Sequence, residues 1–215
     1  MTKIKICGLT NKEDAVCAES LGADYVGFVF FKNSPRCVSV ENAAGIISCL
    51  KKESKTVGLF CNQEINFVTS AVEYLKLDIV QIHGDESCDF VDELRNKFSS
   101  LPEGSSGGIN IIKSFKIAKN FNFDTLTPYK APDFYLFDTY KKGMPGGTGE
   151  VFDWKMLKGR SFNKPFFLAG GLNPSNVKNA ISIANPYAVD VASGIEEKPG
   201  KKDYKLMEGF INAAR

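Results

Sequence analysis

The sequence has 215 residues, a formal net charge of +2 and 43% hydrophobic residues. That composition supports a sizeable core and excludes intrinsic disorder, and the near-neutral charge leaves no electrostatic footprint for a nucleic-acid partner. No apolar run reaches the length of a membrane span, so no membrane partner is expected. The basic pairs Lys141-Lys142 and Lys201-Lys202 are predicted to be solvated surface.

Cysteine and histidine usage limits the chemistry further. The six cysteines form no C-x-x-C pair and have no zinc spacing; they are Cys7, Cys17, Cys37, Cys49, Cys61 and Cys88. Scattered cysteines behind an N-terminus without a signal-peptide layout predict a reduced, cytoplasmic protein. His83 is the one histidine, which excludes mechanisms that need two histidines and most histidine-based metal sites.

Strand and helix signals alternate along the chain. Short apolar runs predict eight strands, at residues 3–7, 24–30, 56–60, 78–82, 109–115, 133–138, 164–169 and 187–191. Helices are predicted at residues 12–21, 40–50, 64–75, 88–98 and 203–214, and Asn173-Pro174 has the residue types of an N-cap and a first helical position. Residues 120–128 have poor periodicity, residues 152–157 predict a short helix, and residues 99–108 predict a loop.

This alternation predicts an α/β fold. Strands that are each followed by a helix or a helix-like segment imply βαβ units and a parallel sheet. Eight such units fit a (β/α)8 TIM barrel, forming one domain over residues 1–215. A doubly wound open sheet is the alternative, but no G-x-G-x-x-G or Walker sequence follows any strand.

The carboxyl ends of parallel strands carry the chemistry in such folds. Cys7 ends the first strand, and Thr10 with Glu13 has the spacing of a capping box that starts the next helix. Cys7 is either a small buried residue or a reactive thiol. His83, after the fourth strand, is either a packed core residue or part of a site. Asp138, ending the sixth, is either a turn cap or an acid in a partly desolvated mouth.

Two further charges and a set of glycines lie at the same strand ends. Arg36 is either a surface charge or a planar fork that binds a carboxylate, and Asp190 belongs to the last strand. Barrel enzymes often bind phosphate with the loops after strands seven and eight and a short extra helix, which the Ser193-to-Glu196 capping-box spacing predicts here. The candidate phosphate residues are Gly146, Gly147, Gly170, Gly171, Ser193 and Gly194.

One thiol, one carboxylic acid, one arginine and a phosphate site favour proton transfer on a small, anionic, phosphorylated substrate. No serine–histidine pair indicates triad hydrolysis. No dinucleotide fingerprint indicates hydride transfer.

The residues at these strand ends match, in the same order along the chain, the sequence motifs of a known family. The matching stretches are Lys5-Ile6-Cys7-Gly8-Leu9-Thr10, Gly27-Phe28-Val29-Phe30 with Ser34-Pro35-Arg36, Val80-Gln81-Ile82-His83-Gly84, Asp138-Thr139 with Gly146-Gly147-Thr148-Gly149, Leu168-Ala169-Gly170-Gly171-Leu172, and Asp190-Val191-Ala192-Ser193-Gly194-Ile195-Glu196 leading to Pro199-Gly200-Lys201-Lys202-Asp203. The chain resembles the phosphoribosylanthranilate isomerase family of tryptophan biosynthesis. The stretches span nearly the whole chain, and their combination is specific.

The resemblance implies an Amadori rearrangement of an aminoaldose to an aminoketose. Asp138 is then the general acid that opens the furanose ring, and Cys7 is the general base that removes the C2 proton. A thiolate suits that role where its pKa falls toward neutrality beside positive charge. Arg36 is expected to bind the anthranilate carboxylate and Asp190 the sugar hydroxyls. His83 is expected to lie near the substrate.

The same resemblance assigns the glycine turns and Ser193 to the phosphate end of the substrate. It implies no cofactor and no metal. The chain is expected to act as a monomer or a homodimer.

Three alternatives remain at this stage. The histidine-pathway isomerase performs the same rearrangement on a larger substrate, but its family has an aspartate in place of Cys7 and repeats its half-barrels. A metal-dependent pentulose-phosphate epimerase needs several histidines. A barrel that only binds a phosphorylated ligand would need neither Cys7 nor Asp138.

The chain departs from the family pattern mainly at residues 99–108, where a shorter connection is expected. This segment joins a helix to the next strand, so it is expected on the face opposite the site. Shortening it should leave turnover intact, which a steady-state assay checks; a large loss of kcat in a folded protein would refute the placement.

Overall fold

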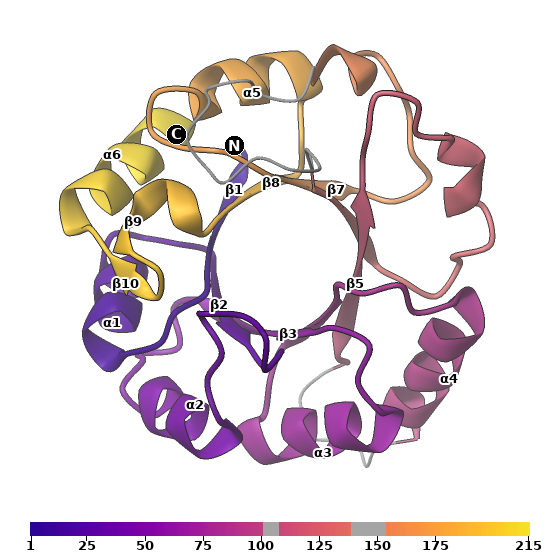
Figure 1. The fold of residues 1–215 in the computed structure, drawn as a ribbon, viewed down its shortest axis with the longest axis horizontal. Coiled ribbons are helices and arrows are strands. Elements are labelled where there is room, and N and C mark those ends of the chain that lie inside the picture. Colours follow the sequence, from indigo (N-terminus) through magenta and orange to yellow (C-terminus); the bar gives the residue numbers. More distant parts are fainter. Residues whose placement is uncertain (101–107, 139–153) are drawn as a thin grey trace.

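A closed barrel of eight parallel strands forms the centre of the computed structural model, which describes residues 1–100, 108–138 and 154–215 (Figure 1). The strands are β1 (Lys3–Cys7), β2 (Tyr25–Val29), β3 (Lys55–Phe60), β4 (Ile79–Ile82), β5 (Asn110–Lys116), β6 (Phe134–Asp138), β7 (Phe166–Ala169) and β8 (Ala188–Val191). Pairing of β1 with β8 closes the ring. The predicted barrel is confirmed, and the open sheet is excluded.

Most of the predicted 99–108 loop, and Gly146 and Gly147, lie outside the described residues.

Helices surround the barrel (Figure 1). The α-helices are α1 (Lys12–Ser20), α2 (Val40–Ile47), α3 (Ile65–Leu75), α4 (Cys88–Ser99), α5 (Val177–Ala184) and α6 (Tyr204–Ala214). The poorly periodic residues 120–128 contain a short 3-10 helix, η1 (Phe123–Leu126). A second, η2 (Trp154–Met156), lies within residues 152–157, where a short helix is predicted. A third, η3 (Ser193–Ile195), follows β8 and leads into a small antiparallel hairpin of β9 (Glu196–Lys198) and β10 (Lys201–Lys202). None of the described helices is long and apolar enough to cross a membrane.

Two predicted helix starts are wrong in detail. The N-cap of α1 is Asn11, whose side chain accepts from the Asp14 N–H, while the Thr10 hydroxyl donates to the Gly200 carbonyl. Thr10 therefore holds the distant hairpin instead of capping the helix. The helix expected at Asn173-Pro174 begins at Val177, because the Asn173 side chain is engaged by the N–H and hydroxyl of Ser175 in a turn.

Side chains inside the barrel change in character along its axis. Alternate strand residues point inward, and an apolar cluster with Val57, Ile112 and Phe167 fills one part of the interior. Toward the carboxyl ends several inward positions are polar, and Lys5 and Gln81 are fully buried there beside a small apolar cluster that contains Val29 and Leu59. A second, larger apolar cluster packs the outer strand faces against the helices. Both members of a buried ion pair, Lys5 and Asp190, therefore lie on the carboxyl side of the apolar cluster that contains Val57.

The loops after β7 and β8 touch at Gly194. A Cβ atom built on Gly194 would lie 1.9 Å from the carbonyl oxygen of Leu172. Backbone thus occupies the space that any side chain at position 194 would need. This contact brings together the two loops in which a phosphate site is predicted.

Gly194→Ala should destabilise the protein by about 1–3 kcal/mol, because the two loops must separate to admit the methyl group. Thermal unfolding measures the loss. Gly45→Ala is the matched control: no atom lies within 4 Å of its added Cβ, and alanine should stabilise α2 by about 0.5–1 kcal/mol. A Gly194→Ala melting temperature equal to that of the wild type would contradict this packing.

Candidate active site

Cys7 ends β1 at the barrel mouth, where its side chain is buried. The next residue, Gly8, has a φ of +74°, which turns the chain away from the strand, and a Cβ there would lie 2.5 Å from Cδ of Arg36. The stem of Arg36 therefore packs over the turn that follows the thiol. Cys7 at the end of β1 and Arg36 in the loop after β2 can approach each other because position 8 has no side chain.

Arg36 is held in a partly buried ion pair. Its Nε donates to Oε1 of Glu196 at 2.8 Å, and its Nη2 donates to Oε2 at 2.5 Å. Glu196 does not form the predicted capping box, since η3 has Ala192 as its N-cap and no side-chain cap bond. Glu196 occupies one edge of the planar guanidinium and leaves the edge that carries Nη1 for another acceptor.

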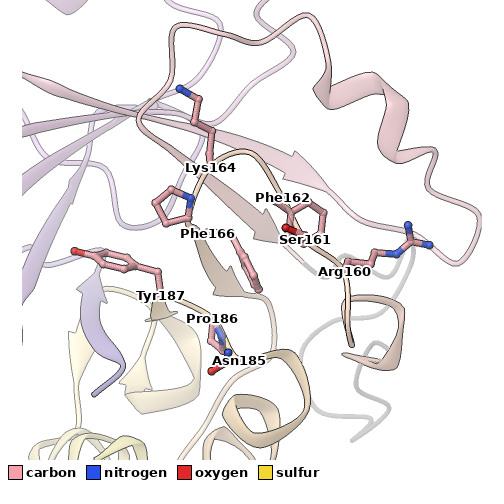
Figure 2. Close-up of a pocket in the computed structure, with 9 residues that line it drawn as sticks. Arg160, Ser161, Phe162, Lys164, Phe166, Asn185, Pro186 and Tyr187 are labelled. Atoms are coloured by element: carbon pink, nitrogen blue, oxygen red, sulfur yellow. The ribbon is translucent and has the colours of Figure 1, made fainter.

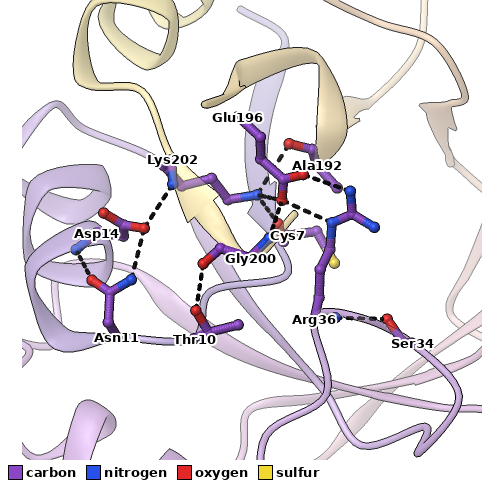
Figure 3. A network of polar contacts seen from close by, with 10 residues as sticks. All are labelled: Cys7, Thr10, Asn11, Asp14, Ser34, Arg36, Ala192, Glu196, Gly200 and Lys202. Atoms are coloured by element: carbon purple, nitrogen blue, oxygen red, sulfur yellow. Dashed lines mark hydrogen bonds and ion pairs between the residues drawn. The ribbon is translucent and has the colours of Figure 1, made fainter. Parts of the chain in front are cut away.

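Lys202 connects this ion pair to the backbone at Cys7 (Figure 3). Its ammonium donates to the Cys7 carbonyl at 2.7 Å, the Ala192 carbonyl at 3.0 Å and Oε1 of Glu196 at 2.9 Å. The prediction that Lys201-Lys202 is solvated surface is wrong for Lys202, which is 1% exposed. An ammonium has three donors, and all three have acceptors here, so the burial is compensated.

The other lysine of the pair also has a partner. Lys201 forms an ion pair with Asp14 of α1 at 2.9 Å, and Asp14 accepts from the Lys202 N–H at 2.8 Å. The hairpin is therefore fixed to both the first strand and the first helix.

A second ion pair is more deeply buried and lies inside the barrel. Nζ of Lys5 donates to Oδ1 of Asp190 at 3.0 Å, across the seam between β1 and β8. Asp190, predicted to meet sugar hydroxyls, thus has one carboxylate oxygen engaged within the protein. The pKa of the Cys7 thiol is raised, because burial outweighs the opposing charge of Lys5. The thiol is therefore the main form of Cys7 near neutral pH.

His83 and Asp138 face each other at the mouth. Nε2 of His83 lies 3.6 Å from Oδ2 of Asp138. Nδ1 of His83 lies 2.9 Å from both the Gln81 amide nitrogen and the Ser114 hydroxyl. Burial, with nearby lysine charges, lowers the pKa of His83 to about 4, so the ring is neutral at pH 7. With the amide donating to Nδ1, the neutral ring carries its proton on Nε2, facing Asp138.

Asp138 has the properties of a proton donor. Burial raises its pKa to about 6, and the negative charge of Asp190 adds to the shift. The same Asp190 charge raises the pKa of Cys7. A carboxyl group with a pKa near neutrality can both hold and release a proton under physiological conditions.

The predicted phosphate residues are brought together only in part. Gly170 and Gly171 directly follow β7 and have φ angles of +87° and +65°. Nothing lies within 4 Å of a Cβ built on Gly171, so its outer face is open. Ser193 and Gly194 begin the predicted short helix, which is confirmed as η3. Two facing turns of exposed backbone with an open side are compatible with an anion.

A cavity of about 440 Å³ lies elsewhere in the barrel (Figure 2). Residues before β7 and β8 line it, among them Lys164, Pro186 and Tyr187. These residues are at the amino ends of the strands, opposite Cys7 and Asp138. The cavity contains no pair of an acid and a base, so we place the candidate site at the carboxyl ends.

Several residues of the site escaped sequence reasoning. Lys5 could have been found, because it interrupts an apolar strand two residues before Cys7 and therefore shares its face. Ser114 and Gln81 also lie at inward strand positions, but nothing in their types distinguishes them from core polar residues. Nothing in the sequence indicated that Lys202 would be buried beside the site, although it belongs to the Pro199-to-Asp203 stretch that resembles the family.

Comparison with known proteins agrees with this geometry. The chain matches the family model described as N-(5'phosphoribosyl)anthranilate (PRA) isomerase over residues 4–213. The N-(5'-phosphoribosyl)anthranilate isomerase of Thermoanaerobacter sp. strain X514 is 44% identical over 215 residues, covering 100% of this chain and 98% of that protein.

Solved structures give the same result. Phosphoribosyl anthranilate isomerase from Thermotoga maritima is 36% identical with a TM-score of 0.86, covering 100% of this chain and 98% of that one. A phosphoribosyl anthranilate isomerase crystallised with reduced 1-(o-carboxyphenylamino)-1-deoxyribulose 5-phosphate is 34% identical with a TM-score of 0.81 and the same coverage. Because sequence and fold agree over the full length, this chain belongs to the N-(5'-phosphoribosyl)anthranilate isomerase family.

Proposed function

We propose that this protein converts N-(5-phosphoribosyl)anthranilate to 1-(2-carboxyphenylamino)-1-deoxyribulose 5-phosphate, the third step from chorismate to tryptophan. The observation that carries the proposal is the pair of proton-transfer groups at one barrel mouth, the Cys7 thiol and the Asp138 carboxyl, with the charge of Asp190 acting on both. A family member bound to a reduced form of the product supports the substrate class.

Asp138 is the general acid of the first step. It gives its proton to the furanose ring oxygen, the C1–O bond breaks, and the nitrogen lone pair forms a protonated Schiff base with C1. A pKa of about 6, raised from the ordinary value for an aspartate, keeps a fraction of the carboxyl protonated at neutral pH. The neutral His83, with its Nε2–H facing Asp138, orients the carboxylate that remains.

Cys7 is the general base of the second step. The iminium acidifies the C2–H, the thiolate takes that proton, and the electron pair moves to form a neutral enolamine. Ketonisation then moves one proton from the C2 hydroxyl to C1. The net reaction is an isomerisation that consumes nothing, and no step in this sequence calls for a cofactor or a metal.

The substrate's two anionic ends have separate partners. The Nη1 edge of Arg36 binds the anthranilate carboxylate, since Glu196 occupies the other edge. Gly170, Gly171, Ser193 and Gly194 are assigned to the phosphate end of the substrate, between the loops that meet at Gly194. Gly146 and Gly147 belong to the same assignment and lie outside the described residues. The remaining oxygen of Asp190 accepts from a sugar hydroxyl. The protein works on this small molecule as one barrel domain in the cytoplasm.

The activity is tested by the fluorescence of freshly made phosphoribosylanthranilate after adding the purified protein with chelator present. We expect rapid loss of signal, and we expect Cys7→Ser and Asp138→Asn each to lower kcat/KM by about 10²–10⁴-fold, since each removes one proton-transfer group. Cys49→Ser, an exposed thiol, is the matched control and should turn over normally. A Cys7→Ser variant with wild-type turnover would remove the assigned base, and a folded wild type without turnover would leave a phosphate-binding barrel of another specificity.

The pH dependence follows from the two groups. Catalysis needs protonated Asp138, with a pKa of about 6, and ionised Cys7, with a pKa raised above its ordinary value. Below about pH 6 Asp138 is already protonated, so each further drop of one pH unit lowers the thiolate fraction of Cys7, and with it kcat/KM, tenfold. Between the two pKa values the gain in thiolate cancels the loss of acid, so kcat/KM should be flat.

Above the thiol pKa, only loss of the protonated acid remains and kcat/KM should fall. A steady-state profile in constant ionic strength measures both limbs. A narrow optimum of kcat/KM near pH 7, or a profile in which kcat/KM does not begin to fall below about pH 6, would contradict the pKa values assigned to the pair.

A further inference from the structure

We propose that Lys5 is a positioning residue for the thiolate, a buried ammonium held against the Cys7 sulfur by Asp190 so that it serves as the counter-ion of the base. The inference rests on the proposed role of Cys7. It identifies Lys5 as the positive charge that allows the buried Cys7 thiol to ionise.

The geometry puts the ammonium stem and the sulfur in one space. Lys5 and Cys7 lie two residues apart on β1 and share its inward face. Gly27 of β2 is paired with Cys7, and a Cβ built on it would lie 3.0 Å from the sulfur and 3.3 Å from Cε of Lys5. The missing side chain of Gly27 leaves room for both groups side by side.

Lys5 remains charged although it is fully buried. Burial by itself lowers the pKa of a lysine, yet the pKa of Lys5 is raised, because the charges of Asp190 and Cys7 outweigh the burial. One N–H goes to Asp190 at 3.0 Å. The Cys7 sulfur is within hydrogen-bonding reach of another.

Other charged groups face Cys7 from neighbouring elements. Lys202 of β10 uses its donors on two carbonyl oxygens and Glu196, and it reaches the backbone of Cys7 instead of the sulfur. Arg36, after β2, is bound to Glu196. Asp190 of β8 opposes ionisation of the thiol but fixes the ammonium that favours it. Of these cations, Lys5 lowers the pKa of the Cys7 thiol the most, and its side chain lies beside the sulfur around Gly27.

The test variant is Lys5→Met, which keeps most of the volume and removes the charge. Two quantities are measured: the alkaline limb of kcat/KM, and the ultraviolet absorbance of the thiolate during pH titration, taken as the difference between each protein and its Cys7→Ser counterpart. We expect the Cys7 titration and the alkaline limb to move to higher pH by about one unit or more. The plateau of kcat/KM should fall by the matching factor, about tenfold per unit.

Lys113→Met is the matched control. Lys113 is equally inaccessible on β5 and pairs with Glu86 at 3.1 Å, so it tests the loss of a buried ion pair without touching Cys7. The control should leave the Cys7 titration where it is in the wild type. An unmoved titration in folded Lys5→Met would overturn the proposal, as would an equal shift in Lys113→Met.

Removing one partner of a buried pair leaves an unpaired charge and can prevent folding. The double variant Lys5→Met/Asp190→Asn removes both charges and keeps the test available. Since the effect of Lys5 on the thiol exceeds that of Asp190, the titration should still move upward, by less than in the single variant; a downward shift would count against Lys5. Cys7→Ser turnover decides the base assignment separately, because the sulfur titration does not depend on catalysis.

Discussion

Pairing of β1 with β8 is the constraint on which the site depends. This seam joins the two ends of the chain, sets Lys5 opposite Asp190 in register, and is reinforced by the Lys202 ammonium, which binds carbonyl oxygens from both sides. Without closure, the thiol at one end of the sheet and the glycine turn after β8 would lie at opposite edges. The barrel therefore creates the site by topology, and the ionic contacts at the seam fix its atoms.

Burial of charge at this seam has a definite energetic logic. Taking ions out of water costs several kcal/mol each unless partners and hydrogen bonds offset it. Lys5 is offset by Asp190, and Glu196 is shared by Arg36 and Lys202. Sharing one carboxylate between two cations leaves a net positive charge beside the mouth, where the proposed substrate would place its carboxylate and phosphate. Because a buried ion pair is weak evidence for stability, the arrangement is better explained by the positive field that it offers to the proposed anionic substrate.

The sequence predicted the barrel and the strand ends well, because alternation of apolar runs and helical periods depends on local order. The bounds of β1 were predicted to the residue. Prediction from the sequence failed for side chains whose bonding partners lie far away along the chain. Thr10 has the spacing of a capping box, but its hydroxyl binds Gly200. Lys202 looks like a surface charge, since lysine is rarely buried, and only closure brings its three acceptors, including the Cys7 carbonyl, into reach.

The proposed acid and base have pKa values in the unexpected order. Asp138 titrates at about 6, whereas the buried thiol titrates above its ordinary value, so the productive pair, a protonated carboxyl and a thiolate, is a minor form at every pH. A stronger counter-ion alone would increase that form, but it would also weaken the thiolate as a base. Asp190, which raises both pKa values while fixing Lys5, increases the protonated fraction of the carboxyl and the basicity of the thiolate. The Lys5–Asp190 ion pair thus balances the population of the productive form against the reactivity of Cys7 and Asp138.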